Sequence, residues 1–132
     1  MPLLLKSPAL VCAVAHMIHA LLFGLYLSLG FRIQILWIGK EKFKAMLDSK
    51  EFKVAHGTQM NNTEWTPYFV AALLYLHAQG AGSTYTAYGS LVSCFCYSSL
   101  KLLTVGRPTP ICAGTRYVML AALIYEVYAT GA

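Results

Sequence analysis

Charged residues are scarce in this chain of 132 residues. Only 11% of the residues are Asp, Glu, Lys or Arg, whereas 58% are hydrophobic. A soluble domain carries about 25% charged residues, so the composition excludes an ordinary soluble domain and is typical of a membrane protein. Acids are the scarcer kind, with five Asp and Glu against ten Lys and Arg, which gives a formal net charge of +5 at pH 7.

Patterns that bind metals or form disulfides are also missing. The cysteines show no paired CxxC spacing, so we expect all four to be buried as small apolar residues: Cys12, Cys94, Cys96 and Cys112. His16 and His19 lie on one face of a predicted helix, but no carboxylate or third ligand stands at a matching depth. We therefore expect no metal, and we interpret these histidines, with His77, as hydrogen-bonding partners of neighbouring helices or of lipid headgroups.

What the chain does have is long apolar blocks separated by short connections. A helix needs about 20 apolar residues to cross the hydrocarbon of a bilayer, and each block is long enough. We therefore predict an all-α fold, an integral membrane four-helix bundle that forms a single domain over residues 1–132. Its transmembrane helices are expected at about 8–38, 61–82, 84–105 and 110–131.

The positive charge is concentrated in two connections. The first connection, GKEKFKAMLDSKEFK, holds five lysines, and the second, after the third predicted helix, holds Lys101 and Arg107, with Arg116 just inside the last helix. By the positive-inside rule these connections face the cytosol, or the equivalent side of an organelle membrane, and both termini lie on the opposite side. Attraction to anionic membrane lipids accounts for this charge without a nucleic acid partner.

The stretch MNNTEWTPYF places polar residues at the mouth of an apolar helix. Asn61, Glu64 and Tyr68 share one helical face because they are spaced by three and four residues. Pro67 removes one backbone hydrogen bond and can kink the helix, which frees carbonyl groups near Thr63 for side chains or water. This pattern predicts a polar recess that faces the basic connections.

The same residues resemble a family motif. Asn-x-x-Glu-x-x-Pro, here Asn61, Glu64 and Pro67, follows a basic loop and opens the second of four predicted helices, as in the MAPEG family of membrane proteins of eicosanoid and glutathione metabolism. An aromatic residue and an arginine shortly before a proline, here Tyr97, Arg107 and Pro110, are similar to a second family pattern.

The resemblance implies a homotrimer, commonly in the endoplasmic reticulum, that binds glutathione between neighbouring subunits. It implies that Arg107 is the catalytic residue, because a nearby cation lowers the pKa of a thiol from about 8.5 and favours the thiolate. The thiolate would then attack a lipophilic electrophile that arrives from the membrane. The implied substrate-binding residues are Asn61, Glu64, Tyr68, Tyr97, Lys101 and His56.

The chain departs from the family at a position that bears on catalysis. Enzymes of the family carry an arginine four residues before the Asn, where this chain has Gly57. His56 replaces that arginine only if the loop is remodelled. Two main hypotheses therefore stay open: a glutathione-dependent transferase or peroxidase, and a non-catalytic MAPEG-like protein that binds lipid or is a structural subunit of a larger membrane complex. The remaining alternative is an unrelated four-helix membrane protein in which Glu64 is a paired structural acid.

Overall fold

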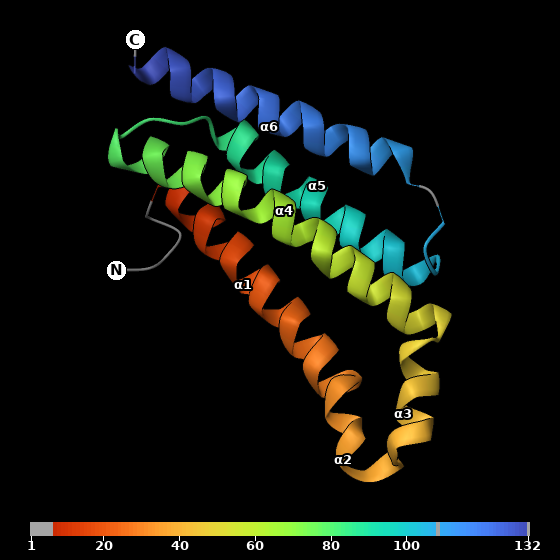
Figure 1. Cartoon of the computed structure of the whole chain (residues 1–132). Helices are drawn as coiled ribbons and strands as arrows, with labels where there is room; N and C mark the ends of the chain where they lie inside the picture. The colour runs from red at the N-terminus through yellow and green to blue at the C-terminus, as the bar shows by residue number, and fades with distance from the viewer. Residues whose placement is uncertain (1–6, 108, 132) are drawn as a thin grey trace.

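The fold is all-helical over the residues described by the computed structural model, 7–107 and 109–131, and no strand occurs among them. The helices are α1 (Pro8–Gly30), the 3₁₀ turn η2 (Arg32–Gln34), α2 (Ile35–Ile38), α3 (Lys40–Leu47), α4 (Lys50–Ala78), α5 (Thr84–Leu103) and α6 (Pro110–Gly131). The four long helices lie side by side and alternate in direction (Figure 1). The predicted all-α class is confirmed.

The packing places α4 and α5 in the middle of the bundle. α1 packs mainly against α4, and α6 packs against both α5 and α4, so α1 and α6 lie on opposite sides (Figure 1). The largest core cluster contains many small side chains, which allow close approach of the helices: Ala9, Cys12, Ala13, Phe69, Leu73, Leu76, Ala87, Cys94 and Leu123. A smaller cluster, Phe23, Leu27 and Ala55, lies toward the α2–α3 end.

Serine side chains begin three of the long helices. Ser7, Ser49 and Ser83 accept hydrogen bonds from the backbone N–H groups three residues later, at 3.2, 3.2 and 3.5 Å. Each bond satisfies a donor that the first helical turn leaves without a partner. At the start of α5 a second contact comes from α6, because the Glu126 carboxylate accepts from the Thr86 hydroxyl at 2.9 Å.

Several predicted helix limits differ from the observed ones, and the second and third helices end at Ala78 and Leu103 rather than near 82 and 105. α4 begins at Lys50 rather than near residue 61, since Ser49 caps it there and hydropathy marks only its apolar part. The expected first span, 8–38, agrees with the apolar segment Pro8–Ile38. It is not one regular α-helix, because α1 ends at Gly30, whose carbonyl accepts from the Gln34 side chain at 2.6 Å, and η2 and α2 follow. The last helix, expected at 110–131, is confirmed. α4 continues as one helix past Pro67.

Two segments are long and apolar enough to cross a membrane, Pro8–Ile38 and Pro110–Gly131. α4 and α5 are not among them. Polar residues explain this, because α4 includes Asn61 to Thr66 and α5 includes four serines. The described part of the chain is therefore helical and contains two candidate membrane spans.

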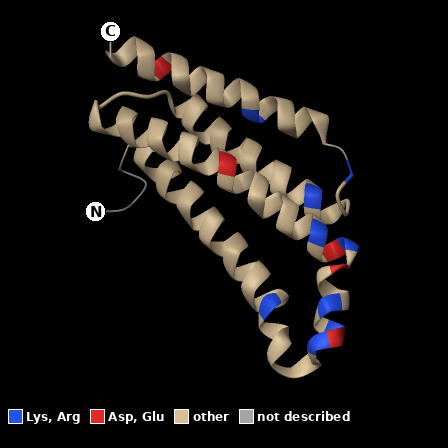
Figure 2. Cartoon of the chain, in the orientation of Figure 1, with Lys and Arg blue, Asp and Glu red and all other residues tan. Residues whose placement is uncertain are grey.

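Charge is distributed unevenly along the bundle. Figure 2 shows that lysine and arginine gather at the end where α3, the start of α4 and the α5–α6 turn meet. The start of α1 and the end of α6 lie at the other end (Figure 1). The two basic connections thus share one end of the molecule (Figure 2). Glu64 lies midway along α4, and Arg116 lies within the first two turns of α6.

Candidate functional site

A polar recess with two lysines lies between α4 and α5 at the basic end. Its volume is about 230 Å³, and it is lined by Lys53, Val54, Gly57, Thr58, Tyr97, Lys101 and Gly106. We call it the lysine recess. It contains two of the predicted substrate-binding residues, Tyr97 and Lys101, together with Gly57, where the family arginine is missing. The ammonium of Lys101 lies 5.7 Å from the centre of the Tyr97 ring and donates to the Arg107 carbonyl oxygen at 3.2 Å.

Two other predicted residues line a hollow between α4 and α6. This Glu64 hollow has a volume of about 380 Å³ and is lined by Glu64, Trp65, Tyr68, Tyr117 and Leu120. It is shaped by helix spacing, since Glu64 and Tyr68 stand four residues apart on α4 and project from the same face. Both side chains are exposed on the single chain.

The Glu64 hollow continues into an apolar groove. Tyr68 and Leu120 line both, and the groove extends along α4 and α6 with a volume of about 330 Å³. The rest of its lining is Ala71, Ala72, Tyr75, Ile124 and Val127. A carboxylate therefore stands at one end of a surface suited to a lipophilic chain.

Arg116, which the sequence reasoning did not select as a site residue, lies between the lysine recess and the Glu64 hollow. Its side chain is 2% exposed. The guanidinium carbon is 3.6 Å from the centre of the Tyr97 ring and 4.7 Å from that of Trp65. Tyr97 lines the recess and Trp65 lines the hollow, so this stack of three side chains joins the two.

The Arg116 guanidinium has unused hydrogen-bond donors. Its Nε and Nη1 atoms are buried and have no partner among the described residues. Contacts with aromatic faces favour a cation but do not replace hydrogen bonds to an anion. The only sequence signal for this site was a lone arginine inside an apolar helix, a position at which a functional role is the default hypothesis.

The two adjacent asparagines of α4 have different surroundings. Asn61 is half-buried, and its Oδ1 atom has no hydrogen-bond partner among the described residues. Asn62 is buried and donates through Nδ2 to the Ser98 hydroxyl of α5 at 2.8 Å. Asn61 thus has an unpaired acceptor and lines neither the lysine recess nor the Glu64 hollow, while Asn62 fixes α4 to α5.

Arg107 and His56 are not brought to the other predicted residues in the single chain. Arg107 is exposed in the α5–α6 turn, and its contact with the site is through its backbone carbonyl. His56 stacks on Phe52 of its own helix, with ring centroids 5.6 Å apart. The structure therefore gathers Tyr97 with Lys101 and Glu64 with Tyr68.

One histidine follows the prediction, and two cysteines do not. His16 bonds through Nε2 to the Ser90 hydroxyl of α5 at 3.1 Å, as predicted for a histidine between helices. No group of three or more potential metal ligands occurs in the described part of the chain. The expectation that all four cysteines are buried is wrong, since Cys96 is exposed and Cys112 half-buried. Cys94 and Cys96, two residues apart on α5, point in different directions.

No protein-family model, curated protein or solved structure matches this chain. The resemblance to the MAPEG family therefore rests on the short motifs of the sequence.

Proposed function

We propose that this protein is an integral membrane protein of the MAPEG type that uses glutathione to conjugate or reduce lipophilic electrophiles. The observation that carries the proposal is the Tyr97–Arg116–Trp65 stack. It connects a recess with two lysines to a hollow that holds Glu64 and opens into an apolar groove. Glutathione has two carboxylates, an ammonium and a thiol, so it needs both cations and an acid.

The groups present match those needs. Lys53 and Lys101 attract a carboxylate at the recess, and the Asn61 oxygen and the Glu64 carboxylate accept from the peptide N–H and ammonium groups. A buried cation lowers the pKa of a nearby thiol more than an exposed one does, because less water screens the interaction. Arg116 is therefore a second candidate, beside Arg107, for favouring the thiolate.

The chemistry follows from the thiolate. After the thiol proton passes to solvent, the sulfur attacks a carbon of the electrophile, a sulfur–carbon bond forms, and a leaving group such as chloride departs with the electron pair. With a lipid hydroperoxide, two glutathione molecules supply two electrons and two protons, which gives a disulfide, an alcohol and water. The apolar groove along α4 and α6 would hold the lipophilic partner beside Glu64.

Membrane embedding and trimer formation are parts of the same proposal. Many large apolar side chains are exposed on α1 and α6, among them Leu21, Leu22, Ile124 and Tyr125. In a bilayer these side chains face lipid, and α4 and α5 complete a bundle of four spans with buried polar residues that include Asn62, Ser90 and Ser93. A neighbouring subunit would cover the exposed Glu64 and could bring its own Arg107 to it.

Glutathione binding and turnover test the proposal together. Purified protein in lipid nanodiscs is titrated with glutathione by calorimetry and assayed with a chlorinated nitrobenzene and a lipid hydroperoxide. We expect binding and turnover in wild type, with turnover abolished by Arg107→Ala or by Arg116→Met, depending on which cation favours the thiolate. Lys42→Ala is the control, because Lys42 is in α3 and lines neither the lysine recess nor the Glu64 hollow. Absence of binding and of turnover with every electrophile would overturn the enzyme proposal.

The exposed position of Arg107 favours a second candidate. In the single chain no described acid forms an ion pair with Arg107, and the α4–α6 groove is mainly apolar. A non-catalytic lipid-binding protein or a structural subunit of a larger membrane complex needs the groove but no activated thiol. Mild-detergent purification followed by mass spectrometry should then recover a stoichiometric lipid or partner. A lone oligomer with tight glutathione binding contradicts this candidate.

A further inference from the structure

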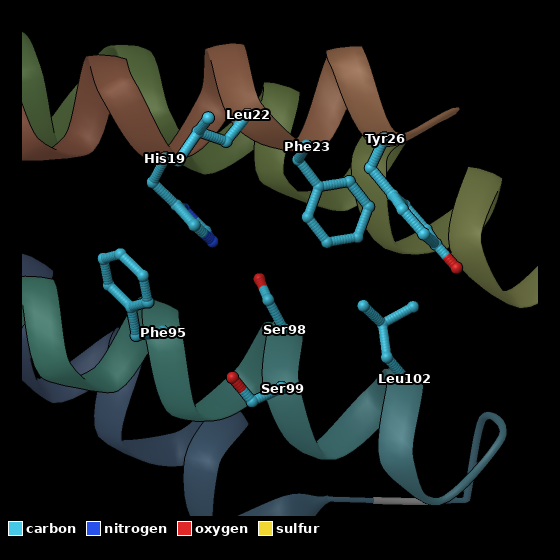
Figure 3. Close-up of a pocket in the computed structure, with 8 residues that line it drawn as sticks. All are labelled: His19, Leu22, Phe23, Tyr26, Phe95, Ser98, Ser99 and Leu102. Atoms are coloured by element: carbon cyan, nitrogen blue, oxygen red, sulfur yellow. The ribbon is translucent and has the colours of Figure 1, made fainter. Parts of the chain in front are cut away.

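A third hollow lies between α1 and α5. Its volume is about 240 Å³, and it is lined by His19, Leu22, Phe23, Tyr26, Phe95, Ser98, Ser99 and Leu102. We call it the His19 hollow. It shares no lining residue with the lysine recess or the Glu64 hollow, and Figure 3 shows the side chains of α1 facing those of α5 across it.

His19 is the buried polar residue of this hollow. Its side chain is 6% exposed, and its Nδ1 atom is buried with no hydrogen-bond partner among the described residues. Nδ1 of His16, three residues earlier on the same helix, is also unpaired, but its Nε2 bonds to the Ser90 hydroxyl. No described residue forms a hydrogen bond with the His19 ring at all, and an unpaired buried polar group is costly, so the unbonded His19 ring points to a ligand.

Ser98 supplies a second polar group. Its hydroxyl oxygen accepts from Asn62 of α4 at 2.8 Å, which leaves its hydrogen for another acceptor. Figure 3 shows this hydroxyl directed from α5 toward α1. A ligand oxygen between the two helices could accept from Ser98 and exchange a hydrogen bond with the His19 ring.

Aromatic side chains form the walls. The ring centroids of His19 and Phe95 are 4.4 Å apart, and the rings of Phe23 and Tyr26 meet edge to face at 6.0 Å. A flat ring extends such a set of contacts better than a branched chain. Pockets for whole drug-sized molecules have volumes of about 300–1,000 Å³, so this smaller hollow suits one end of a molecule.

We propose that the His19 hollow binds the oxygen-bearing ring of a lipophilic molecule, a quinone or a phenol, with Ser98 and His19 bonded to the ring oxygen. Leu22 and Tyr26 at its edge are 57% and 46% exposed. The apolar tail of the ligand would leave along them into the surrounding lipid. This site is independent of glutathione chemistry.

The test uses decylbenzoquinone as the probe and decylbenzene, which has the same tail and no oxygen, as the control ligand. Protein labelled with ¹⁵N-histidine in nanodiscs is titrated with each. We expect the quinone to shift the His19 signals and not those of His77, which lies outside the hollow. His19→Phe keeps an aromatic ring and should weaken binding about tenfold, the effect of one lost hydrogen bond. Ser98→Ala should weaken it by a similar factor.

His77→Phe is the matched control and should bind the quinone as wild type does. The proposal is overturned if decylbenzene binds as tightly as the quinone, if the His19 signals do not move, or if both hollow variants retain full affinity. Glutathione titration of His19→Phe keeps the two proposals separate. If His19→Phe loses quinone binding and keeps glutathione binding, the quinone site is supported independently of the glutathione proposal. If the variant keeps quinone binding and loses glutathione binding, the quinone site is contradicted.

Discussion

At the scale of single residues, Gly57 offers a direct test of the glutathione site. A Cβ atom at this position meets no atom within 4 Å, and Gly57 lines the lysine recess inside α4. Gly57→Arg therefore fits, and it should tighten glutathione binding about fivefold, roughly 1 kcal/mol for a partly exposed carboxylate contact. Calorimetric titration measures the change.

The controls for this substitution separate charge from helix stability. Gly57→Ala gains the same helix propensity, about 0.5–1 kcal/mol, but adds no cation, so its affinity should stay at the wild-type value. Gly57→Glu should weaken binding. If all three variants bind glutathione equally, no carboxylate of the peptide lies near the lysine recess.

Arg116 should show a conflict between stability and function. Burying a guanidinium with unpaired donors costs several kcal/mol, more than the roughly 2 kcal/mol that a desolvated cation–π contact contributes. Arg116→Met keeps an unbranched side chain against Tyr97 and Trp65, so we expect an unfolding free energy equal to or above that of wild type, with glutathione binding reduced at least tenfold. Denaturation in detergent measures the first quantity.

The exposed Arg107 is the matched position for this comparison. Arg107→Met should leave the unfolding free energy unchanged, because its side chain is exposed on the turn. A loss of about 2 kcal/mol or more in Arg116→Met with intact glutathione binding would instead make Arg116 a structural residue.

At the scale of elements, the turn between α5 and α6 depends on Gly106. Its φ is +83°, and a Cβ atom there would lie 2.8 Å from Cγ2 of Val54 on α4. Gly106→Ala therefore combines left-handed backbone strain of about 1–2 kcal/mol with a steric clash, and it should lower the melting temperature in detergent.

Gly39 also has a positive φ, +84°, and a Cβ atom there meets nothing within 4 Å. Its ψ is 159°, in a region that is essentially limited to glycine, so Gly39→Ala should show backbone strain without a steric contact. The contact with Val54 is measured by adding Val54→Ala to Gly106→Ala, which should recover the steric part of the loss. No recovery in this double variant would mean that the turn does not press on α4.

The sequence predicted which segments are helical more accurately than it predicted where each helix begins and ends. The last helix was predicted at its observed bounds because Pro110 fixes its start and its apolar run is long. Hydropathy missed the first turns of α4, where Ser49 caps a segment that is too polar to count as a span. It also joined α1 to α2, since the break after Gly30 changes backbone geometry without changing apolarity.

At the scale of the whole molecule, the sequence predicted only those parts of the candidate site in which residue spacing along one helix brings side chains together. Glu64 and Tyr68 share a hollow because they are four residues apart on one helix, and this was readable from the sequence. The pairing of Tyr97 with Arg116 depends on how α5 packs against α6. One sequence does not give that register, so the buried cation was missed and the exposed Arg107 was favoured by resemblance.

The difference in charge between the two ends of the bundle predicts a membrane topology that cysteine labelling can test. Lys42 in α3 and Gln79 after α4 are exposed at opposite ends. In microsomes with the cytosolic side outward, a membrane-impermeant maleimide should label Lys42→Cys directly and Gln79→Cys only after detergent. Cys96 and Cys112 are first replaced by alanine, because they are exposed and half-buried and would react with the maleimide. Cys12 and Cys94 are buried and can stay.

The expected labelling pattern follows from the distribution of charge along the bundle. If α4 spans the bilayer, its two ends must lie on opposite sides, and the lysine-rich end is retained on the cytosolic side. Labelling of both cysteines without detergent would mean that α4 does not cross, which removes the bundle of four spans and the lipid access to the α4–α6 groove. If only Gln79→Cys is labelled without detergent, the orientation in the membrane is the opposite of the predicted one. Glutathione would then have to reach the lysine recess from the opposite compartment.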